Sequence, residues 1–218
     1  MCCFSLLTVF VSFTNSHAES WLENAKVRPY LEVLKSDATL DKPFQGLIST
    51  YREAKKSHLL LSDVQLLTGK PEWKIQGQLL YARVLIHHSQ NTKAHRVLTS
   101  VCKKSPGISR VWLLRARLEM RRQLLKESLV SFDSALKASG SDRESQLIIL
   151  GQAEVMHTMG KTAEATNRML HLYVRTPGDV TLYSLILNKL ERWHQYPSAL
   201  RLVKGHSHAL SQQGADLD

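Results

Sequence analysis

The chain has 218 residues and a formal net charge of +10 at pH 7, and 43% of its residues are hydrophobic. That length is enough for one or two domains with a substantial core. β-branched alternation bounded by Asn-Gly or Asp-Gly turns is nearly absent, whereas good helix formers dominate. The composition therefore excludes a β-rich fold and predicts an all-α chain.

The first eighteen residues contain no Lys, Arg, Asp or Glu, and positions 4–13 form an apolar run of ten. A transmembrane helix needs about 20 apolar residues, so this run is too short to span a bilayer. Small residues at Ser16 and Ala18 favour a signal peptide over residues 1–18, cleaved after Ala18, and hence a periplasmic protein of a bacterium. The positive n-region is missing, which leaves open an upstream start or an uncleaved segment of a cytoplasmic protein.

Cysteine usage gives no disulfide framework. Cys2 and Cys3 would leave with the leader, so Cys102 would be the only thiol of the mature chain. The helical register places Cys102 beside Val101 on a buried side, which predicts a core residue.

Residues 19–70 are expected to form a helical lead-in. A first helix, interrupted or kinked near Pro29, is expected over residues 21–36. A second is expected from Asp41, which would serve as its N-cap. A third is expected over about residues 57–67, ending at a left-handed Gly69. Whether this stretch is a degenerate repeat is left open.

Residues 71–211 show a repeated register. Small residues lie near the start of each second helix at spacings of 34, 37 and 34: Ala94, Ser128, Ala165 and Ala199. Twelve residues before each of them lie Ala82, Ala116, Ala153 and Leu187. The three extra residues fall in a loop, where an insertion costs little, and Ser141 with Glu144 there predicts a capping box.

This register resembles the tetratricopeptide repeat, whose period is 34 residues. The matching residues of the first unit are Ala82, Ala94 and Pro106; of the second, Trp112, Ala116, Ser128, Phe132 and Ala135; of the third, Ala153, Gly160, Ala165 and Pro177. The fourth is weaker, with Leu187 and His206 at small-residue positions, as in a terminal capping unit. The resemblance covers about residues 73–211 and leaves 212–218 as a tail. It implies an α-solenoid of about four antiparallel helical hairpins in a right-handed superhelix, whose first helices line a concave groove.

The excess positive charge is concentrated in part of the predicted array. Residues 74–137 contain thirteen Lys or Arg and only three Asp or Glu. The resemblance implies that the second, ninth and thirteenth positions of a first helix face the groove, and these hold Arg83, His87, Arg110, Arg117, Arg121, Asn188 and Arg192. A cationic groove favours a carboxylate-rich or phosphorylated partner segment, although a merely solvated basic surface is the alternative. Alanine at Arg83, Arg117 and Arg121 is expected to leave stability nearly unchanged.

The sequence offers no catalytic machinery. Gly160-Lys161-Thr162 lacks the preceding glycine of a phosphate-binding loop, where Val155 stands instead. The His87-His88 pair has no Cys or carboxylate placed to complete a metal site. We therefore expect no enzyme activity, no cofactor and no metal.

The sequence predicts a non-catalytic scaffold that binds a peptide or partner protein with acidic segments in its concave groove. If the leader is real, envelope, secretion or surface-polymer assembly is the expected setting. One alternative is a nucleic-acid-binding helical repeat, which the net charge favours. Exported proteins rarely meet nucleic acid, however, and the polar pairs of base-reading repeats are not evident. A docking subunit of an enzyme complex is the other alternative.

Overall fold

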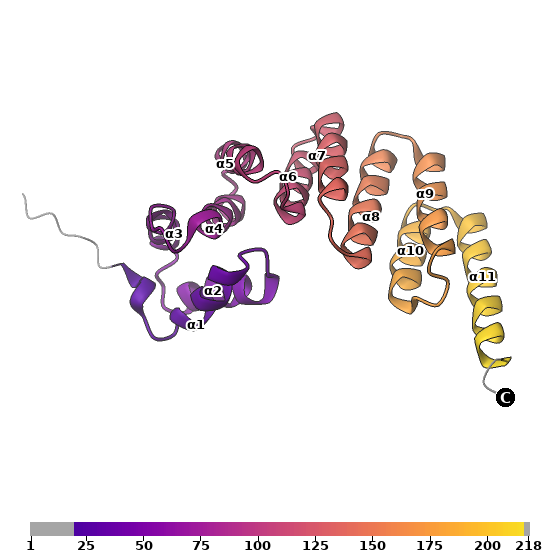
Figure 1. The fold of residues 1–218 in the computed structure, drawn as a ribbon, viewed down its shortest axis with the longest axis horizontal. Helices are drawn as coiled ribbons and strands as arrows, with labels where there is room; N and C mark the ends of the chain where they lie inside the picture. Colours follow the sequence, from indigo (N-terminus) through magenta and orange to yellow (C-terminus); the bar gives the residue numbers. More distant parts are fainter. Residues whose placement is uncertain (1–19, 216–218) are drawn as a thin grey trace, which may run out of the picture.

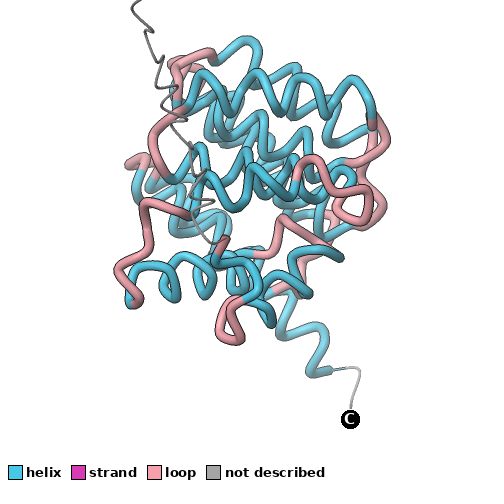
Figure 2. The backbone as a smooth tube through the Cα atoms, turned by 90° about the vertical axis from the view of Figure 1, so that its left-hand side faces the viewer, coloured by secondary structure: helices cyan, strands magenta, loops and turns pink. Residues whose placement is uncertain are grey.

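The computed structural model describes residues 20–215, with side chains to residue 208. The predicted leader and its cleavage point lie outside the described residues. The described part contains eleven α-helices after one short 3-10 helix and no strand (Figures 1 and 2). The elements are η1 Trp21–Glu23, α1 Arg28–Ser36, α2 Asp41–Glu53, α3 Leu60–Leu67, α4 Lys74–His87, α5 Asn91–Lys104, α6 Ser109–Arg121, α7 Leu125–Lys137, α8 Asp142–Thr158, α9 Thr162–Val174, α10 Val180–Arg192 and α11 Tyr196–Ala215. No helix in the described range is long and apolar enough to cross a membrane.

From α4 onward each helix packs on the next one in the chain, and α6 also touches α8. Short turns join the helices into antiparallel pairs, which follow one another along the molecule (Figure 1). The predicted all-α solenoid is therefore confirmed.

Small residues allow the two helices of each pair to approach closely. The small residues of the first three pairs (Ala82, Ala94, Ala116, Ser128, Ala153 and Ala165) all have 0% of their surface exposed. At the second crossing the Ser128 hydroxyl donates to the Ala116 carbonyl at 2.8 Å. Larger side chains beside these points interdigitate and fill the remaining space.

A left-handed residue follows the first helix of every hairpin. Gly160 has a φ of +81° between α8 and α9, as its position at the predicted turn requires. Non-glycine residues take the same conformation at the equivalent turns: Lys55, Ser89, Gln123 and His194. In each case the next residue's N–H bonds to a carbonyl five positions back, as in Gln90 to Leu85 at 2.8 Å. The recurrence at Lys55 shows that the α2–α3 turn has the geometry of a repeat.

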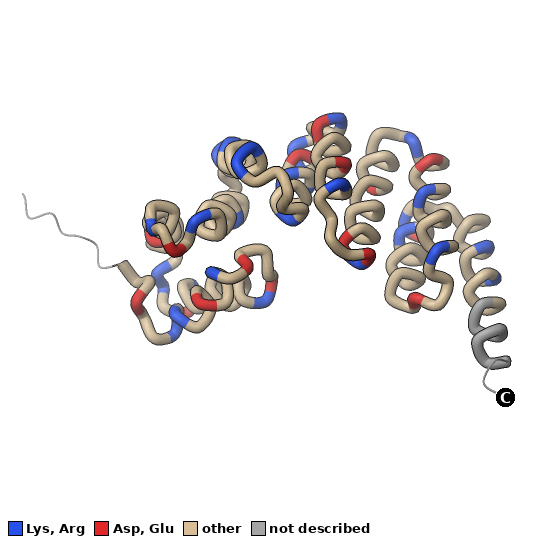
Figure 3. Tube along the Cα trace, viewed as in Figure 1, with Lys and Arg blue, Asp and Glu red and all other residues tan. Residues whose placement is uncertain are grey.

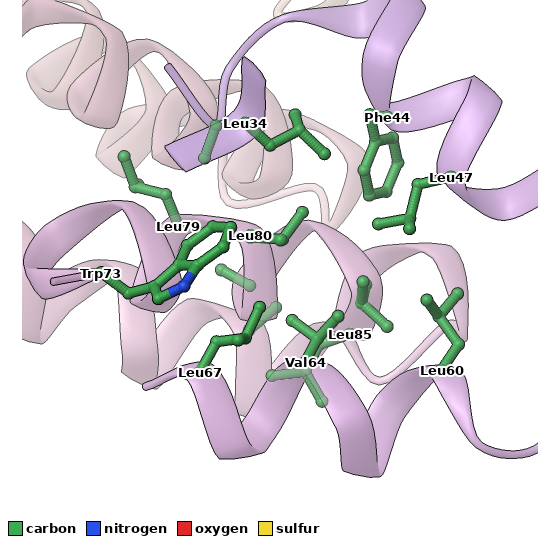
Figure 4. Close-up of a cluster of buried hydrophobic side chains, with 14 of the residues drawn as sticks. Leu34, Phe44, Leu47, Leu60, Val64, Leu67, Trp73, Leu79, Leu80 and Leu85 are labelled. Carbon is green, nitrogen blue, oxygen red and sulfur yellow. The ribbon is translucent and has the colours of Figure 1, made fainter. Parts of the chain in front are cut away.

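The lead-in departs from a regular hairpin although its turn is regular. α2 packs mainly on α1, and α3 packs on α4 (Figure 1). A hydrogen bond of 2.8 Å from the Tyr51 hydroxyl to Asp63 still links α2 to α3. In Figure 4 the leucines of α4 lie between side chains of α2 and α3, so one core joins the lead-in to the array.

Several local expectations need correction. The interruption expected near Pro29 within residues 21–36 is present but lies upstream of the proline, because η1 ends at Glu23 and α1 begins at Arg28 with Pro29 in its first turn. The N-cap of α2 is Leu40, and Asp41 is the first helical residue. Gly69 is not left-handed, since Gly160 is the positive-φ glycine of the described residues. Ser141 does cap α8, accepting from the Glu144 N–H at 3.3 Å, and Cys102 is buried, which raises its pKa to about 11.

The last hairpin accommodates large residues at its small-residue positions. His206 is buried, stacks on Tyr183 with ring centroids 4.0 Å apart, and bonds to the Tyr173 hydroxyl at 2.6 Å. α11 leaves Tyr196 and Leu200 more than half exposed, and Arg201 and Lys204 of the same helix are exposed as well. The exposed surface of this unit is therefore mixed in character.

Two helical glycines provide a matched test of the packing. A Cβ at Gly77 would lie 2.9 Å from the Leu67 carbonyl oxygen, whereas at Gly205 it would meet nothing within 4 Å. We expect Gly77→Ala to lower the free energy of unfolding by about 1–3 kcal/mol, because the α3 backbone must shift. Gly205→Ala should raise it by about 0.5–1 kcal/mol, because alanine favours the helix. Urea unfolding followed by circular dichroism measures both, and equal effects would contradict the α3–α4 packing.

Candidate functional site

Arg83 of α4 is enclosed by the connection between α1 and α2, residues 37–41, which we call the α1–α2 corner. Only 8% of Arg83 is exposed. Its guanidinium donates to the carbonyls of Ala38 and Leu40 at 2.8 Å each and to the Asp41 carboxylate at 2.5 Å. Burial lowers the pKa of Arg83 from its ordinary value, while the charges of Asp41 and Asp37 act in the opposite direction. The arginine thus ties the corner to α4.

Two more residues of the first helices hold the same corner. Gln76 of α4 accepts a hydrogen bond from the Ala38 N–H at 2.9 Å. Arg110 of α6 forms an ion pair with Asp37 and lies 3.4 Å from the Thr39 hydroxyl. Burial alone would raise the pKa of Asp37, but hydrogen bonds from Thr39 and the positive charge of Arg110 lower it below its ordinary value.

The corner therefore contacts residues at the register positions where the repeat resemblance implies contact with a ligand. Arg83 is the ninth residue of its repeat, and Gln76 and Arg110 are the second residues of theirs. All three side chains contact the acidic corner of the same chain. Arg83 and Arg110 are engaged within the chain, and the part of the surface left open begins farther along α6.

Arg117 and Arg121 occupy the open part of α6. Both are exposed, and neither has a hydrogen bond or ion pair within the described part of the chain. They lie one helical turn apart on the same face. His87 is also exposed but lies at the end of α4 with its ring 5.3 Å from that of His88. Burial, His88 and Arg52 all lower the pKa of His87.

A shallow hollow of about 660 Å³ lies on α10. Asn188 and Arg192 line it, are exposed and have no hydrogen-bond or ion-pair partner among the described residues. Lys189 beside them is held by Glu154 of α8 at 2.8 Å. Glu154 is the ninth residue of the repeat that begins with α8, so the ion pair places this position next to the lining of the α10 hollow. It also neutralises the charge of the lysine.

A buried ionic network attaches α6 to its two neighbouring helices. The Glu119 carboxylate is fully buried and accepts from Arg115 Nε at 2.8 Å and from the Ser131 hydroxyl at 2.6 Å. His95 Nε2 of α5 lies 2.8 Å from the same carboxylate. The network links α5, α6 and α7, so Arg115 belongs to the packing although it lies within the basic run.

The basic residues are not confined to the first helices of the pairs. Figure 3 shows α5 with basic residues and no acidic ones, and Arg96 of α5 is exposed. α5 is the second helix of its pair. Cationic side chains thus lie on both kinds of helix, and position in the repeat distinguishes Arg117 and Arg121 from Arg96.

Sequence reasoning identified Asn188 and Arg192 but not the other residues that line the hollow: Val180, Thr181, Ser184, Leu185 and Lys189. The helical spacing of three, four and four residues from Thr181 to Ser184, Asn188 and Arg192 was available as a signal. The α1–α2 corner had no such signal, because its contacts join residues about 40 or more positions apart. Among the described residues no three His, Cys, Asp or Glu side chains converge as metal ligands would.

Comparison with solved structures identifies the fold. The chain superposes on the crystal structure of MamA with a TM-score of 0.55 at 10% identity, covering 76% of this chain and 95% of MamA. It matches YrrB, described as a TPR protein with an unusual peptide-binding site, at 0.50 and 9%, covering 83% and 91%. It matches the APC/C hetero-tetramer Cut9–Hcn1 at 0.55 and 11%, covering 85% of this chain and 35% of that one.

The fold is that of the tetratricopeptide repeat proteins. The resemblance seen in the sequence is therefore confirmed at the level of structure. No family model matches the sequence, and no curated protein matches it. The similarity concerns architecture, so the function has to be argued from the side chains of this chain.

The corner contacts change what we expect of Arg83. Arg83→Leu should lower the free energy of unfolding by about 2–4 kcal/mol, because the buried acceptors of the corner lose their donor. Arg117→Leu, which removes the same charge from an exposed site, should change it by less than about 0.5 kcal/mol. Chemical denaturation of both variants measures the difference. Equal small effects would show that the corner is not anchored by Arg83.

Proposed function

We propose that the protein is a non-catalytic interaction scaffold that holds an acidic segment of a partner protein on the concave surface from α6 to α10. One observation supports this most directly. The concave positions that hold the chain's own acidic corner, Arg83 and Arg110, continue along the array as Arg117 and Arg121, which have no partner in the described part of the chain.

The chemistry of the corner indicates what this surface recognises. Its groups in contact with Arg83 and Arg110 are carboxylates, a hydroxyl and peptide carbonyls. An extended acidic peptide presents the same groups, and a guanidinium pairs with carboxylates through charge-assisted hydrogen bonds. The peptide-binding site described for YrrB, a neighbour in fold, supports a peptide ligand.

A protein ligand fits this surface better than a nucleic acid does. Phosphate recognition favours cations along the whole path of a strand. Here the positive charge of Lys189 is matched by Glu154, and the hollow on α10 includes aliphatic side chains. A nucleic acid would therefore meet two free arginines on α6, but in the α10 hollow it would meet Arg192 alone among aliphatic and neutral polar side chains.

We also propose that the protein is exported. An apolar leader over residues 1–18 supports export, with a role in envelope, secretion or surface-polymer assembly. Fractionation of the source cells followed by sequencing of the mature N-terminus tests this. We expect Glu19 as the first residue of an exported form, whereas an intact Met1 in the cytosol would contradict export.

The groove is tested with a double variant and a charge-matched control. Arg117→Ala with Arg121→Ala should weaken binding of a fluorescein-labelled hexaglutamate peptide at least about tenfold, or about 1.4 kcal/mol. Arg96→Ala with Arg175→Ala removes two exposed arginines from second helices or their ends. This control should change the affinity by less than about twofold, because net charge acts weakly across screened distances. Fluorescence anisotropy in about 0.15 M salt measures both.

The outcome that contradicts the proposal is equal weakening by the two double variants, which would indicate non-specific attraction to a basic surface. A random 20-nucleotide DNA strand provides a second control. Binding of that strand which persists at 0.15 M salt and depends on Arg117 and Arg121 would favour the nucleic-acid hypothesis instead.

A further inference from the structure

The open surface changes its chemistry between α6 and α10. At α6 it presents the two unpaired arginines Arg117 and Arg121. Farther along, Glu154 of α8 is paired with Lys189 of α10, so neither adds a free charge to this surface. At α10 the hollow is lined by Val180 and Leu185, which are 58% and 41% exposed, by hydroxyl and amide groups, and by Arg192 at its end.

From this gradient we infer that the ligand is an extended peptide with an acidic end over α6 and an aliphatic side chain in the α10 hollow. The inference rests on the proposed function and specifies its ligand. Leu185 and Val180 offer apolar surface that remains exposed to water in the free protein. Asn188 beside them can donate to and accept from a peptide bond at once, because its side chain carries both kinds of group.

The distance between the two ends sets the spacing in the ligand. α8 lies between the two helices: Arg110 of α6 is 3.9 Å from Glu144 of α8, and α8 contacts α10 through Glu154 and Lys189. Packed helices are about 8–10 Å apart, so α6 and α10 are separated by about 20 Å. An extended chain covers this distance in about six residues. The acidic and aliphatic residues of the ligand are therefore about six positions apart.

The α4 end of the groove, which the corner closes, supports placing the acidic end of the peptide over α6. At α4 and the start of α6 the α1–α2 corner already occupies Arg83 and Arg110, and the Asp41 side chain, although paired with Arg83, is 84% exposed. An acidic ligand that extended past Arg117 toward α4 would meet the like charge of Asp41 and find both arginines already paired. Its remaining residues are thus directed from α6 toward α10.

The test uses the full chain and two fluorescein-labelled peptides, Glu-Glu-Gly-Ser-Gly-Ser-Gly-Leu and the same peptide ending in Ala. The leucine peptide should bind about tenfold more tightly, since its aliphatic side chain leaves water. Leu185→Ala should reduce this preference to about twofold or less while leaving the affinity for the alanine peptide unchanged. Leu66→Ala, which alters a leucine 57% exposed on α3, should leave the preference intact.

The α10 pocket and the acidic groove can be disproved separately. If both peptides bind equally, yet both lose affinity in the Arg117→Ala, Arg121→Ala double variant, the hollow is not a side-chain pocket and the inference is wrong while the acidic groove stands. If neither peptide responds to the arginine substitutions, the proposed groove itself is wrong. A shorter peptide, Glu-Glu-Gly-Leu, should show no leucine preference, and an undiminished preference would contradict the spacing.

Discussion

The close approach of paired helices is the constraint on which the rest of the structure depends. A hairpin can bury its apolar faces only if its two backbones approach closely, and buried Ala or Ser at the crossings permits this. Because one hairpin cannot cover its own outer face, the pairs must stack, and stacking places equivalent positions of successive first helices side by side. The ion pair between Glu154 of α8 and Lys189 of α10 is a direct contact between two such neighbouring first helices. The functional surface is thus a consequence of the packing period.

The α1–α2 corner sets the limit of that surface. A buried guanidinium is tolerated only when its donors are satisfied, and Arg83 meets this condition with two backbone carbonyls and a carboxylate. The corner therefore gives the lead-in a defined place on α4, and Arg110 extends the attachment to α6. What remains open is a surface with Arg117 and Arg121 at one end and, at the other, the α10 hollow, where aliphatic and neutral polar side chains lie beside Arg192. Its chemistry suits a peptide with two unlike ends.

Features with a local cause could be predicted from the sequence. The repeat register, the turn at Gly160, the cap at Ser141 and the burial of Cys102 depend on residues near one another in the chain. The corner could not be predicted in this way, because it depends on contacts such as Arg83 with Ala38, 45 residues apart. Arg83 and Arg117 occupy equivalent register positions, yet one is enclosed and the other exposed. Register gives the direction of a side chain, and tertiary packing decides whether a partner already lies there.

The central claim is that a ligand meets first-helix positions from α6 onward while the corner keeps α4 closed. Side-chain Nε–Hε signals of arginine, followed by NMR during titration with the leucine-ended acidic peptide, test it most directly. The account predicts that the signals of Arg117, Arg121 and Arg192 shift with a single saturating affinity, while those of Arg83 and Arg96 stay in place. Shifts of Arg96 with Arg117 and Arg121 unmoved would place the ligand on the second helices and contradict the account.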